Sequence, residues 1–297
     1  MNDAERRVWS QLPAGTRESL AGLSSSDLQT LLLSVARARA SRVRPADLVR
    51  RWREDRFVRP AASDPRALAD LEARMWRLLP ADFEGVELSP VVPLGTCAAV
   101  TPQSQDRIVS TVRTAEVVSD STNALAIEAA HRRLSQPAGG EVHVAACHRM
   151  LRAQRFPAGF GSHFRLFALV SSARDTGSGT TQARLLTRHL RYWHSVLPAE
   201  VEPRLLFTIF DSPVLRERVR DTVAPAVPVT ELPDREHGRG YYVEGAIRIA
   251  AGSDEIGDGG FTTWTAQLMG NAKERCLVSC ISTERLAALT ARTGPAG

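Results

Sequence analysis

The residue types that could do chemistry in this chain are mostly charge carriers. We find no Walker phosphate-binding loop, no zinc-protease signature and no evident nucleophile–histidine–acid set. His143, Cys147 and His148 look like a metal cluster in the sequence. On a strand, however, His143 and Cys147 would be ~13 Å apart, and His148 would point to the other face. We therefore expect no shared metal ion at these residues.

Cysteine usage and overall composition are typical of a cytoplasmic globular protein. Cys97, Cys147, Cys276 and Cys280 form no C-x-x-C pair, and we expect free, buried thiols. The N-terminus lacks the apolar core of a signal peptide, and no run is apolar enough to cross a membrane. Arginine excess of this kind is usual for a GC-rich genome, so the net charge of +5 would help tRNA binding without requiring it.

Residues 1–60 are expected to form a helical appendage, and residues 61–297 an α/β core. A serine-rich cap followed by apolar residues at helical spacing predicts a helix over residues 24–35, and Pro45 suits the first position of another. Nine arginines lie between residues 37 and 59. They could contact a nucleic-acid backbone, or they could form an ordinary solvated helix face.

The first part of the core is expected to alternate helices and strands. Asp64-Pro65 supplies a cap and a first-turn proline for an amphipathic helix that ends at Pro80. A strand over Phe83–Pro90 is expected to follow. Further along, the polar cluster at residues 120–123 can cap a helix that continues to Leu134.

A hairpin with a long loop is expected next. Glu141–Arg152 and Ser162–Val170 alternate as strands do, and a glycine-containing segment joins them. The pattern then predicts an amphipathic helix over residues 181–197 and a short buried strand over Leu205–Phe210. Residues 221–238 are rich in proline and charge and are expected to form a loop.

The last part of the chain combines two strands with a glycine pair. Alternation over Arg239–Ala251 would place Tyr241 on an apolar face, and Tyr242 and Glu244 on a polar face that could line a pocket. The run GDGGFTTWTAQL then brings a glycine pair to the start of a helix. After it, CLVSCISTERLAAL is a β-run that passes into a helix at Thr-Glu-Arg-Leu, residues 283–286.

In order and spacing, these segments resemble the catalytic core of class II aminoacyl-tRNA synthetases, and most of all the histidyl type. The resemblance covers roughly residues 65–290. The helix and strand of residues 65–90 correspond to the dimer-forming first motif, the hairpin to the second, and residues 276–289 to the third. The resemblance implies an antiparallel β-sheet flanked by helices, a homodimer, and ATP with Mg²⁺ as ligands.

The second and third motifs imply an ATP site. Arg152 would contact the α-phosphate, where a fixed cation stabilises the charge that grows as a carboxylate attacks. Gln154 stands where the family has a glutamate facing adenine, and Phe164 takes the position of a phenylalanine on the return strand. Glu284 and Arg285 match the glutamate–arginine pair whose arginine clamps the γ-phosphate. Arg152 and Arg285 are thus the implied catalytic residues.

The resemblance also implies a site for the amino acid. Asp120 and Thr122 occupy the acidic and hydroxyl positions of a turn that holds the substrate's α-amino group, although Asp120 could equally serve only as a helix cap. The tyrosine strand shapes the rest of that site in the family, and the glycine pair permits close approach of the backbone to a ligand. The residues assigned in this way are Asp120, Thr122, Tyr241, Tyr242, Glu244, Gly259 and Gly260.

The sequence departs from the family at positions that bear on the substrate. The family's catalytic arginine before the tyrosines is replaced by His237 or displaced to Arg239, so histidine is not implied as the substrate. Ser279, Cys280 and Ser282 occupy a strand where the family has glycines beside adenine. Their side chains could crowd adenine or indicate a different acyl donor.

We expect ATP-dependent activation of an amino acid as an aminoacyl adenylate. The acceptor could be a carrier protein, a small molecule or tRNA. Because the chain stops where the family continues into an anticodon-binding domain, a biosynthetic role is expected in place of general tRNA charging. Two alternatives stay open. One is a non-catalytic, amino-acid-sensing paralogue resembling the regulatory subunit of the short ATP phosphoribosyltransferase. The other is a tRNA-binding accessory protein that uses residues 37–59.

Overall fold

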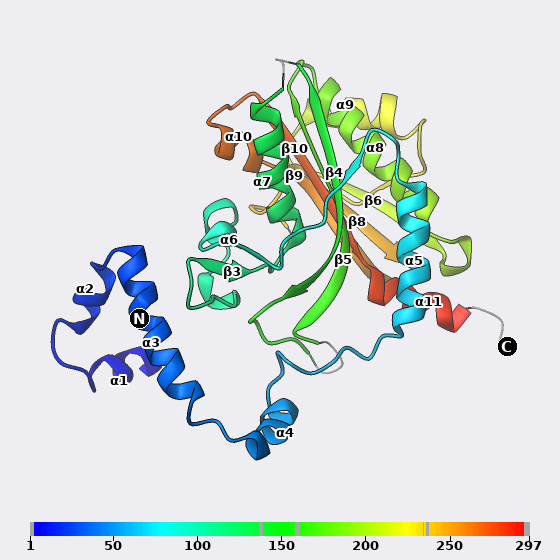
Figure 1. Ribbon diagram of the computed structural model, residues 1–297. Helices are drawn as coiled ribbons and strands as arrows, with labels where there is room; N and C mark the ends of the chain where they lie inside the picture. Colours follow the sequence, from blue (N-terminus) through cyan, green and yellow to red (C-terminus); the bar gives the residue numbers. More distant parts are fainter. Residues whose placement is uncertain (1–2, 137–138, 158–160, 234, 236–237, 294–297) are drawn as a thin grey trace.

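An eight-stranded mixed sheet forms the centre of the molecule (Figure 1). The computed structural model describes residues 3–136, 139–157, 161–233, 235 and 238–293. In sheet order, the strands are β1 (Glu84–Gly85), β4 (Glu141–Leu151), β5 (His163–Arg174), β10 (Glu274–Ser282), β9 (Asp254–Thr262), β8 (Val243–Ala251), β6 (Pro203–Ile209) and β7 (Thr230–Glu231). The six central strands pair antiparallel, and the two edge strands pair parallel. The predicted antiparallel sheet flanked by helices is confirmed.

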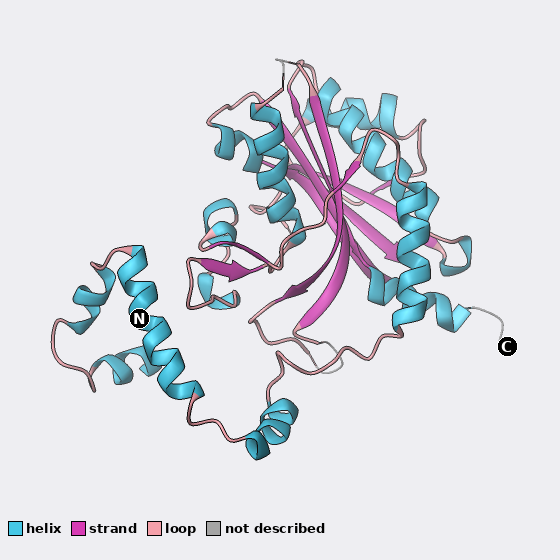
Figure 2. Ribbon diagram, in the orientation of Figure 1, coloured by secondary structure: helices cyan, strands magenta, loops and turns pink. Residues whose placement is uncertain are grey.

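Helices cover both faces of the sheet (Figure 2). One face carries α7 (Ser121–Leu134) and α10 (Trp264–Met269). The other carries α5 (Pro65–Leu78), α8 (Thr180–Val196), α9 (Pro213–Arg218) and α11 (Thr283–Thr293). The alternation of β5 serves both layers: Phe167 and Leu169 pack under α8, whereas Ala168 and Val170 pack under α7.

Side-chain caps set the start of two helices that the sequence predicted. Asp64 accepts a hydrogen bond from the Arg66 amide at 2.9 Å and begins α5, with Pro65 in its first turn. Asp120 does the same for α7 by accepting from the Thr122 amide at 3.0 Å. Both predicted helix starts are confirmed, and the second one places a carboxylate at the N-terminal end of α7.

A chain of buried polar side chains crosses the α8 face of the sheet. The Ser171 hydroxyl lies 2.7 Å from His143 Nδ1 and 2.8 Å from His189 Nε2. His189 Nδ1 is in turn 2.7 Å from the Ser279 hydroxyl, which also accepts from Trp193 Nε1 at 2.8 Å. Burial lowers the pKa of His189 well below its ordinary value. This polar chain links β4, β5, α8 and β10, and it supplies hydrogen-bond partners for the buried His143 and His189.

The N-terminal residues form helices that stand away from the sheet (Figure 1). They are α1 (Asp3–Trp9), α2 (Thr16–Ala21), α3 (Ser25–Ala40) and α4 (Pro45–Glu54), and none of their residues is buried. Ser24 caps α3 by accepting from the Asp27 amide at 3.2 Å. These four helices lie within the range expected for the helical appendage, and residues 55–63 connect them to α5.

Short elements around the sheet correct two predictions. The strand expected over Phe83–Pro90 pairs only at Glu84–Gly85, and a separate two-stranded sheet forms from β2 (Val91–Pro93) and β3 (Ala115–Val117). Residues 221–238 are not simply a loop, since they contain the end of a π-helix and β7. The remaining short helices are α6 (Thr96–Val100), η1 (Gln105–Arg107), η2 (Ala199–Val201) and the π-helix η3 (Val219–Val223). No helix in the described part of the chain is long and apolar enough to span a membrane.

The tyrosine strand is shorter and less regular than predicted. It begins at Val243, and its pairing with β9 shifts between Val243 and Ala246. Glu244 lies in this bulge with a φ of 57°, so the expected alternation is broken there. Glu244 instead accepts a hydrogen bond from Gln182 Nε2 of α8 at 3.1 Å. The placement of Glu244 on the same face as Tyr242 was wrong.

Candidate functional site

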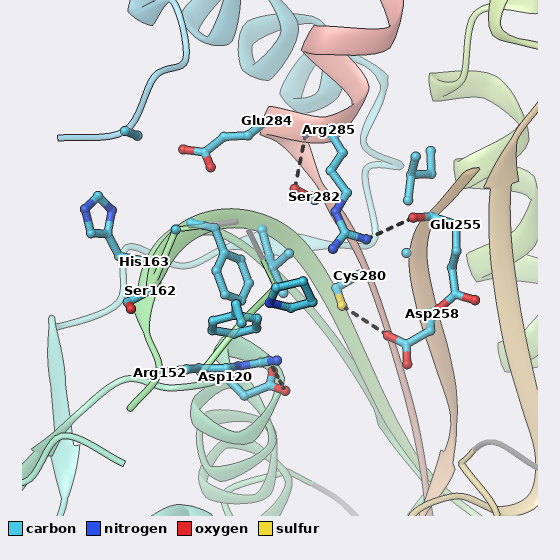
Figure 3. Close-up of a pocket in the computed structure, with 18 of the residues that line it drawn as sticks. Asp120, Arg152, Ser162, His163, Glu255, Asp258, Cys280, Ser282, Glu284 and Arg285 are labelled. Carbon is cyan, nitrogen blue, oxygen red and sulfur yellow. Dashed lines mark hydrogen bonds and ion pairs between the residues drawn. The ribbon is translucent and has the colours of Figure 1, made fainter. Parts of the chain in front are cut away.

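A cavity of about 1410 Å³ opens at the end of the sheet where β4, β5 and β10 meet α7 and α11 (Figure 3). Its walls come from the β4–β5 loop, from residues 238–242, from β9 and β10, and from the first turn of α11. Residues 56–63 of the N-terminal connection add a further wall. Segments far apart in the sequence therefore build one site.

Arg152 and Asp120 meet on one side of this cavity. Arg152 Nε donates to the Ser119 carbonyl at 2.8 Å, and its Nη2 lies 3.3 Å from Asp120 Oδ2. The guanidinium carbon stands 5.1 Å from the ring centroid of Phe164. Asp120 uses its other oxygen to accept from the Thr122 amide and hydroxyl, the latter at 2.7 Å. Asp120 thus serves as a helix cap and as a cavity carboxylate at once.

Arg285 and Glu284 enter the cavity from the first turn of α11. Figure 3 shows Arg285 reaching into the space from the side opposite Arg152, and its Nη1 donates to the Glu255 carbonyl at 3.0 Å. Glu284 accepts from Arg149 Nη2 at 2.8 Å. The cavity therefore has a guanidinium on each of two walls, as a polyphosphate ligand requires.

The inner wall combines aromatic rings with a carboxylate that the sequence did not single out. Tyr241 and Tyr242 stack edge to face with ring centroids 4.9 Å apart. The Tyr242 hydroxyl donates to Asp258 Oδ2 at 3.1 Å, and Cys280 Sγ lies 3.8 Å from Asp258 Oδ1. Burial, and then the nearby Asp120 carboxylate, raise the pKa of Asp258. The only available signal was an acidic residue among the glycines of the GDGG run.

The glycine pair does not border the cavity. A Cβ on Gly259 would lie 2.4 Å from the Val278 carbonyl oxygen, and one on Gly260 would lie 2.6 Å from Tyr242 Cγ. These glycines therefore permit close strand packing and make room for the Tyr242 ring, and the expected approach of their backbone to a ligand is corrected. Gly257, two residues earlier, does line the cavity.

Two more of the predicted site residues lie behind the cavity wall. The Gln154 carbonyl accepts from Arg56 Nη1 at 2.7 Å, and Gln154 is not among the lining residues. Thr122 is buried and is bonded to Asp120, which places it one layer behind the surface. Two residues could correspond to the family's catalytic arginine. Arg239 lines the cavity, and His237 lies outside the described residues.

The N-terminal connection holds the β4–β5 loop, which the sequence gave no reason to expect. Arg56 donates to the Gln154 carbonyl, to the Ala153 carbonyl and, at 2.9 Å, to the Ser162 hydroxyl. His163 Nε2 also binds the Arg59 carbonyl. Arg56 thus bridges both ends of the β4–β5 loop, which forms part of the cavity wall.

Comparison with known proteins identifies the fold. No protein-family model and no curated protein matches the sequence. The structure is similar to histidyl-tRNA synthetase from Nostoc sp. PCC 7120, with a TM-score of 0.60 and 13% identity over 82% of this chain and 76% of that one. It is also similar to an ATP phosphoribosyltransferase regulatory subunit/histidyl-tRNA synthetase from Bacillus halodurans, with a TM-score of 0.58 and 8% identity over 77% of this chain and 81% of that one.

A third similar structure is apo histidyl-tRNA synthetase from S. aureus, with a TM-score of 0.54 and 13% identity over 76% of this chain. The present chain spans 65% of that protein's length. The chain has the fold of a class II aminoacyl-tRNA synthetase core of the histidyl type.

Proposed function

We propose that the cavity binds an amino acid together with ATP and joins them as an aminoacyl adenylate. The observation that carries this proposal is the convergence of Arg152, Arg285 and Asp120 on one cavity from three separate elements. Two guanidinium groups suit a polyphosphate, and a carboxylate at the end of α7 suits an ammonium group. This chemistry needs no carboxylate, thiol or hydroxyl side chain of the protein as a nucleophile.

The reaction is a direct displacement. A carboxylate oxygen of the amino acid attacks the α-phosphorus of ATP, the new C–O–P link forms, and the bond from that phosphorus to the bridging oxygen breaks as pyrophosphate leaves. Arg152 stabilises the negative charge on the α-phosphoryl oxygens, and Arg285 holds the far end of the leaving group. Asp120 orients the substrate by its α-ammonium group, which keeps the carboxylate aimed at phosphorus.

Magnesium would enter this site with the nucleotide. Among the residues that the structure describes, no three histidine, cysteine, aspartate or glutamate side chains gather as a ready-made metal site. When bound, Mg²⁺ would neutralise part of the charge of the phosphates. Glu284 is the carboxylate beside Arg285 and would lie at that end of the cavity.

Amino-acid-dependent exchange of pyrophosphate into ATP tests the proposal directly. We expect exchange with at least one amino acid, and we expect Arg285→Ala to lower it by about 100-fold. Arg292→Ala is the matched control, because Arg292 lies on the same helix, is exposed and pairs with Asp254. No exchange with any amino acid, together with no ATP binding in calorimetry, would contradict the proposal.

A second candidate function is an amino-acid-sensing regulatory subunit. It is favoured by Cys280 and Ser282, which line the cavity where the family has glycines, and by Arg152, which is paired with Asp120 in the present structure. The Bacillus halodurans protein is described in part as an ATP phosphoribosyltransferase regulatory subunit. Binding of an amino acid without any ATP binding would support this candidate over the enzyme.

The assembly and the acceptor belong to the same proposal. We infer a homodimer from the order of α5 and the strand after it, and a cytoplasmic location from the synthetase-like fold. The acceptor would be a carrier protein, tRNA or a small molecule. The arginine-rich residues 37–59 lie on helices without buried residues and on the connection after them, so a nucleic-acid contact there is the tRNA-accessory alternative. A steep loss of tRNA affinity with salt would support that alternative, and sedimentation would test the dimer.

A further inference from the structure

Asp258 is the carboxylate with the weakest set of partners in the cavity. It lies on β9, directly opposite Cys280 of β10 and Arg248 of β8. Its contacts are the Tyr242 hydroxyl at 3.1 Å and the Cys280 sulfur at 3.8 Å. The Tyr242 distance exceeds the 2.5–2.7 Å that is typical of a strong O–H···O⁻ bond, and a thiol is a weak donor. Within the described residues, the hydrogen-bond partners of this carboxylate are therefore neutral groups.

The cations around Asp258 are directed elsewhere. Arg248, its cross-strand neighbour, pairs with the Glu255 carboxylate at 3.0 Å. Arg152 pairs with Asp120, and Arg285 donates to the Glu255 carbonyl. The charge of Arg235 opposes the rise in the pKa of Asp258, and its Nη1 donates to the Ile247 carbonyl. Among the described residues, the side-chain contacts of Asp258 thus include no ion pair with a cation.

The surroundings of Asp258 suit an alkyl chain that ends in a cation. Tyr241 and Tyr242 line the cavity, and Tyr241 also stacks on Trp264 with ring centroids 5.6 Å apart. Ring faces favour methylene groups and cations. Figure 3 shows Asp120 and Asp258 on different walls of the same space, one at the end of α7 and the other on β9. A ligand between them meets two carboxylates.

We propose that Asp258 selects the side chain of the substrate, and that the amino acid bound here carries a second basic nitrogen, as an amine or a guanidinium. The inference rests on the proposed function, in which Asp120 holds the α-ammonium group. The side-chain cation then forms a charge-assisted hydrogen bond with Asp258 and replaces the weak contacts of Tyr242 and Cys280. Neutral and acidic side chains leave the Asp258 carboxylate without a cation, and they are rejected for that reason.

Isothermal titration with matched amino acids tests this inference without nucleotide. The pairs are lysine with norleucine, ornithine with norvaline, and arginine with citrulline. In the wild-type protein we expect at least one cationic member to bind more than tenfold tighter than its neutral match. Asp258→Asn should abolish that difference, because the amide keeps the shape and loses the charge. Equal or tighter binding of the neutral members, or an unchanged difference in Asp258→Asn, overturns the inference.

Controls separate this result from misfolding and from the proposed function. Asp254 lies on the same strand and is exposed, so Asp254→Asn should keep the wild-type preference for cationic amino acids. Asp258→Asn should also keep the wild-type affinity for ATP, since its side chain is not among the phosphate contacts. Pyrophosphate exchange with neutral amino acids alone would leave adenylation standing and would remove Asp258 as a cation selector. Binding of cationic amino acids without any pyrophosphate exchange would support Asp258 as a cation selector and would contradict adenylation. Binding of no amino acid from either group removes both.

Discussion

The ion pair between Arg152 and Asp120 competes with both of the proposed ligands. Under the proposed function, the nucleotide needs Arg152 and the amino acid needs Asp120, yet each side chain is occupied by the other at 3.3 Å. Asp120→Asn removes the charge that holds Arg152 while keeping a good helix cap for α7. We therefore expect Asp120→Asn to bind the nucleotide more tightly than the wild-type protein does, although Asp120 lies in the substrate site.

The size of the effect follows from the exposure of the pair. The Arg152 side chain is 25% exposed and that of Asp120 is 15%, so the pair is neither fully solvated nor fully buried. Such a pair stabilises by about 1 kcal/mol. This corresponds to about a fivefold gain in nucleotide affinity, because 1.4 kcal/mol is tenfold. Arg152 keeps its bond to the Ser119 carbonyl and so remains oriented in the variant.

Calorimetry with α,β-methylene ATP, which binds without forming an adenylate, measures this gain. Glu255→Gln is the matched control, because it removes a negative charge from the same cavity and leaves the Arg152 pair intact. In an Arg152→Gln background, Asp120→Asn should change the affinity little. An Asp120→Asn protein with unchanged affinity, or an equal gain in the Arg152→Gln background, would refute the reasoning.

Three further predictions concern the cavity wall, the inner carboxylate and the core. Arg56→Ala should raise the KM for ATP by roughly tenfold, because the β4–β5 loop loses its bridge, whereas Arg50→Ala on exposed α4 should not. The folded-state pKa of Asp258 is raised, so the contribution of Asp258 to the stability of the wild type should fall as pH rises from about 4 through that pKa. The melting temperature of Asp258→Asn should therefore exceed that of the wild type increasingly over this interval; a constant difference would contradict the assignment. Glu274→Gln should lower the free energy of unfolding by about 3–5 kcal/mol in urea titrations, since buried Arg133 loses its partner at 2.9 Å, and a loss below about 1 kcal/mol would be inconsistent with this.

The resemblance to class II synthetases assigned Arg152 and Arg285 to one site, and both residues line the cavity. Arg152 follows a strand and Arg285 opens a helix, and both placements depend on patterns within ten residues. Asp120 was recognised from its capping cluster, and the structure joins that role to a place in the cavity. The fold class followed from the order of such segments.

Features that depend on distant segments were not predictable in the same way. Glu244 turned away because a bulge interrupts its strand, and no glycine marks the positive φ there. The role proposed for Asp258 depends on its contacts with Tyr242 and Cys280, which come from other segments of the chain. Arg56 acts on a loop almost a hundred residues away. Sequence periodicity does not describe contacts of this range.

The polar chain on the α8 face has a consequence for the opposite face. Ser279 of β10 satisfies His189 and Trp193, and the next residue, Cys280, points to the cavity. A slip of β10 by one residue would turn Ser279 toward the cavity and leave His189 and Trp193 of α8 without this hydrogen-bond partner. The hydrogen bonds of Ser279 on the α8 face thus help to fix the register of β10. That register decides which side chains of β10 face the cavity. Substitutions at His189 should consequently alter ligand preference without touching a ligand.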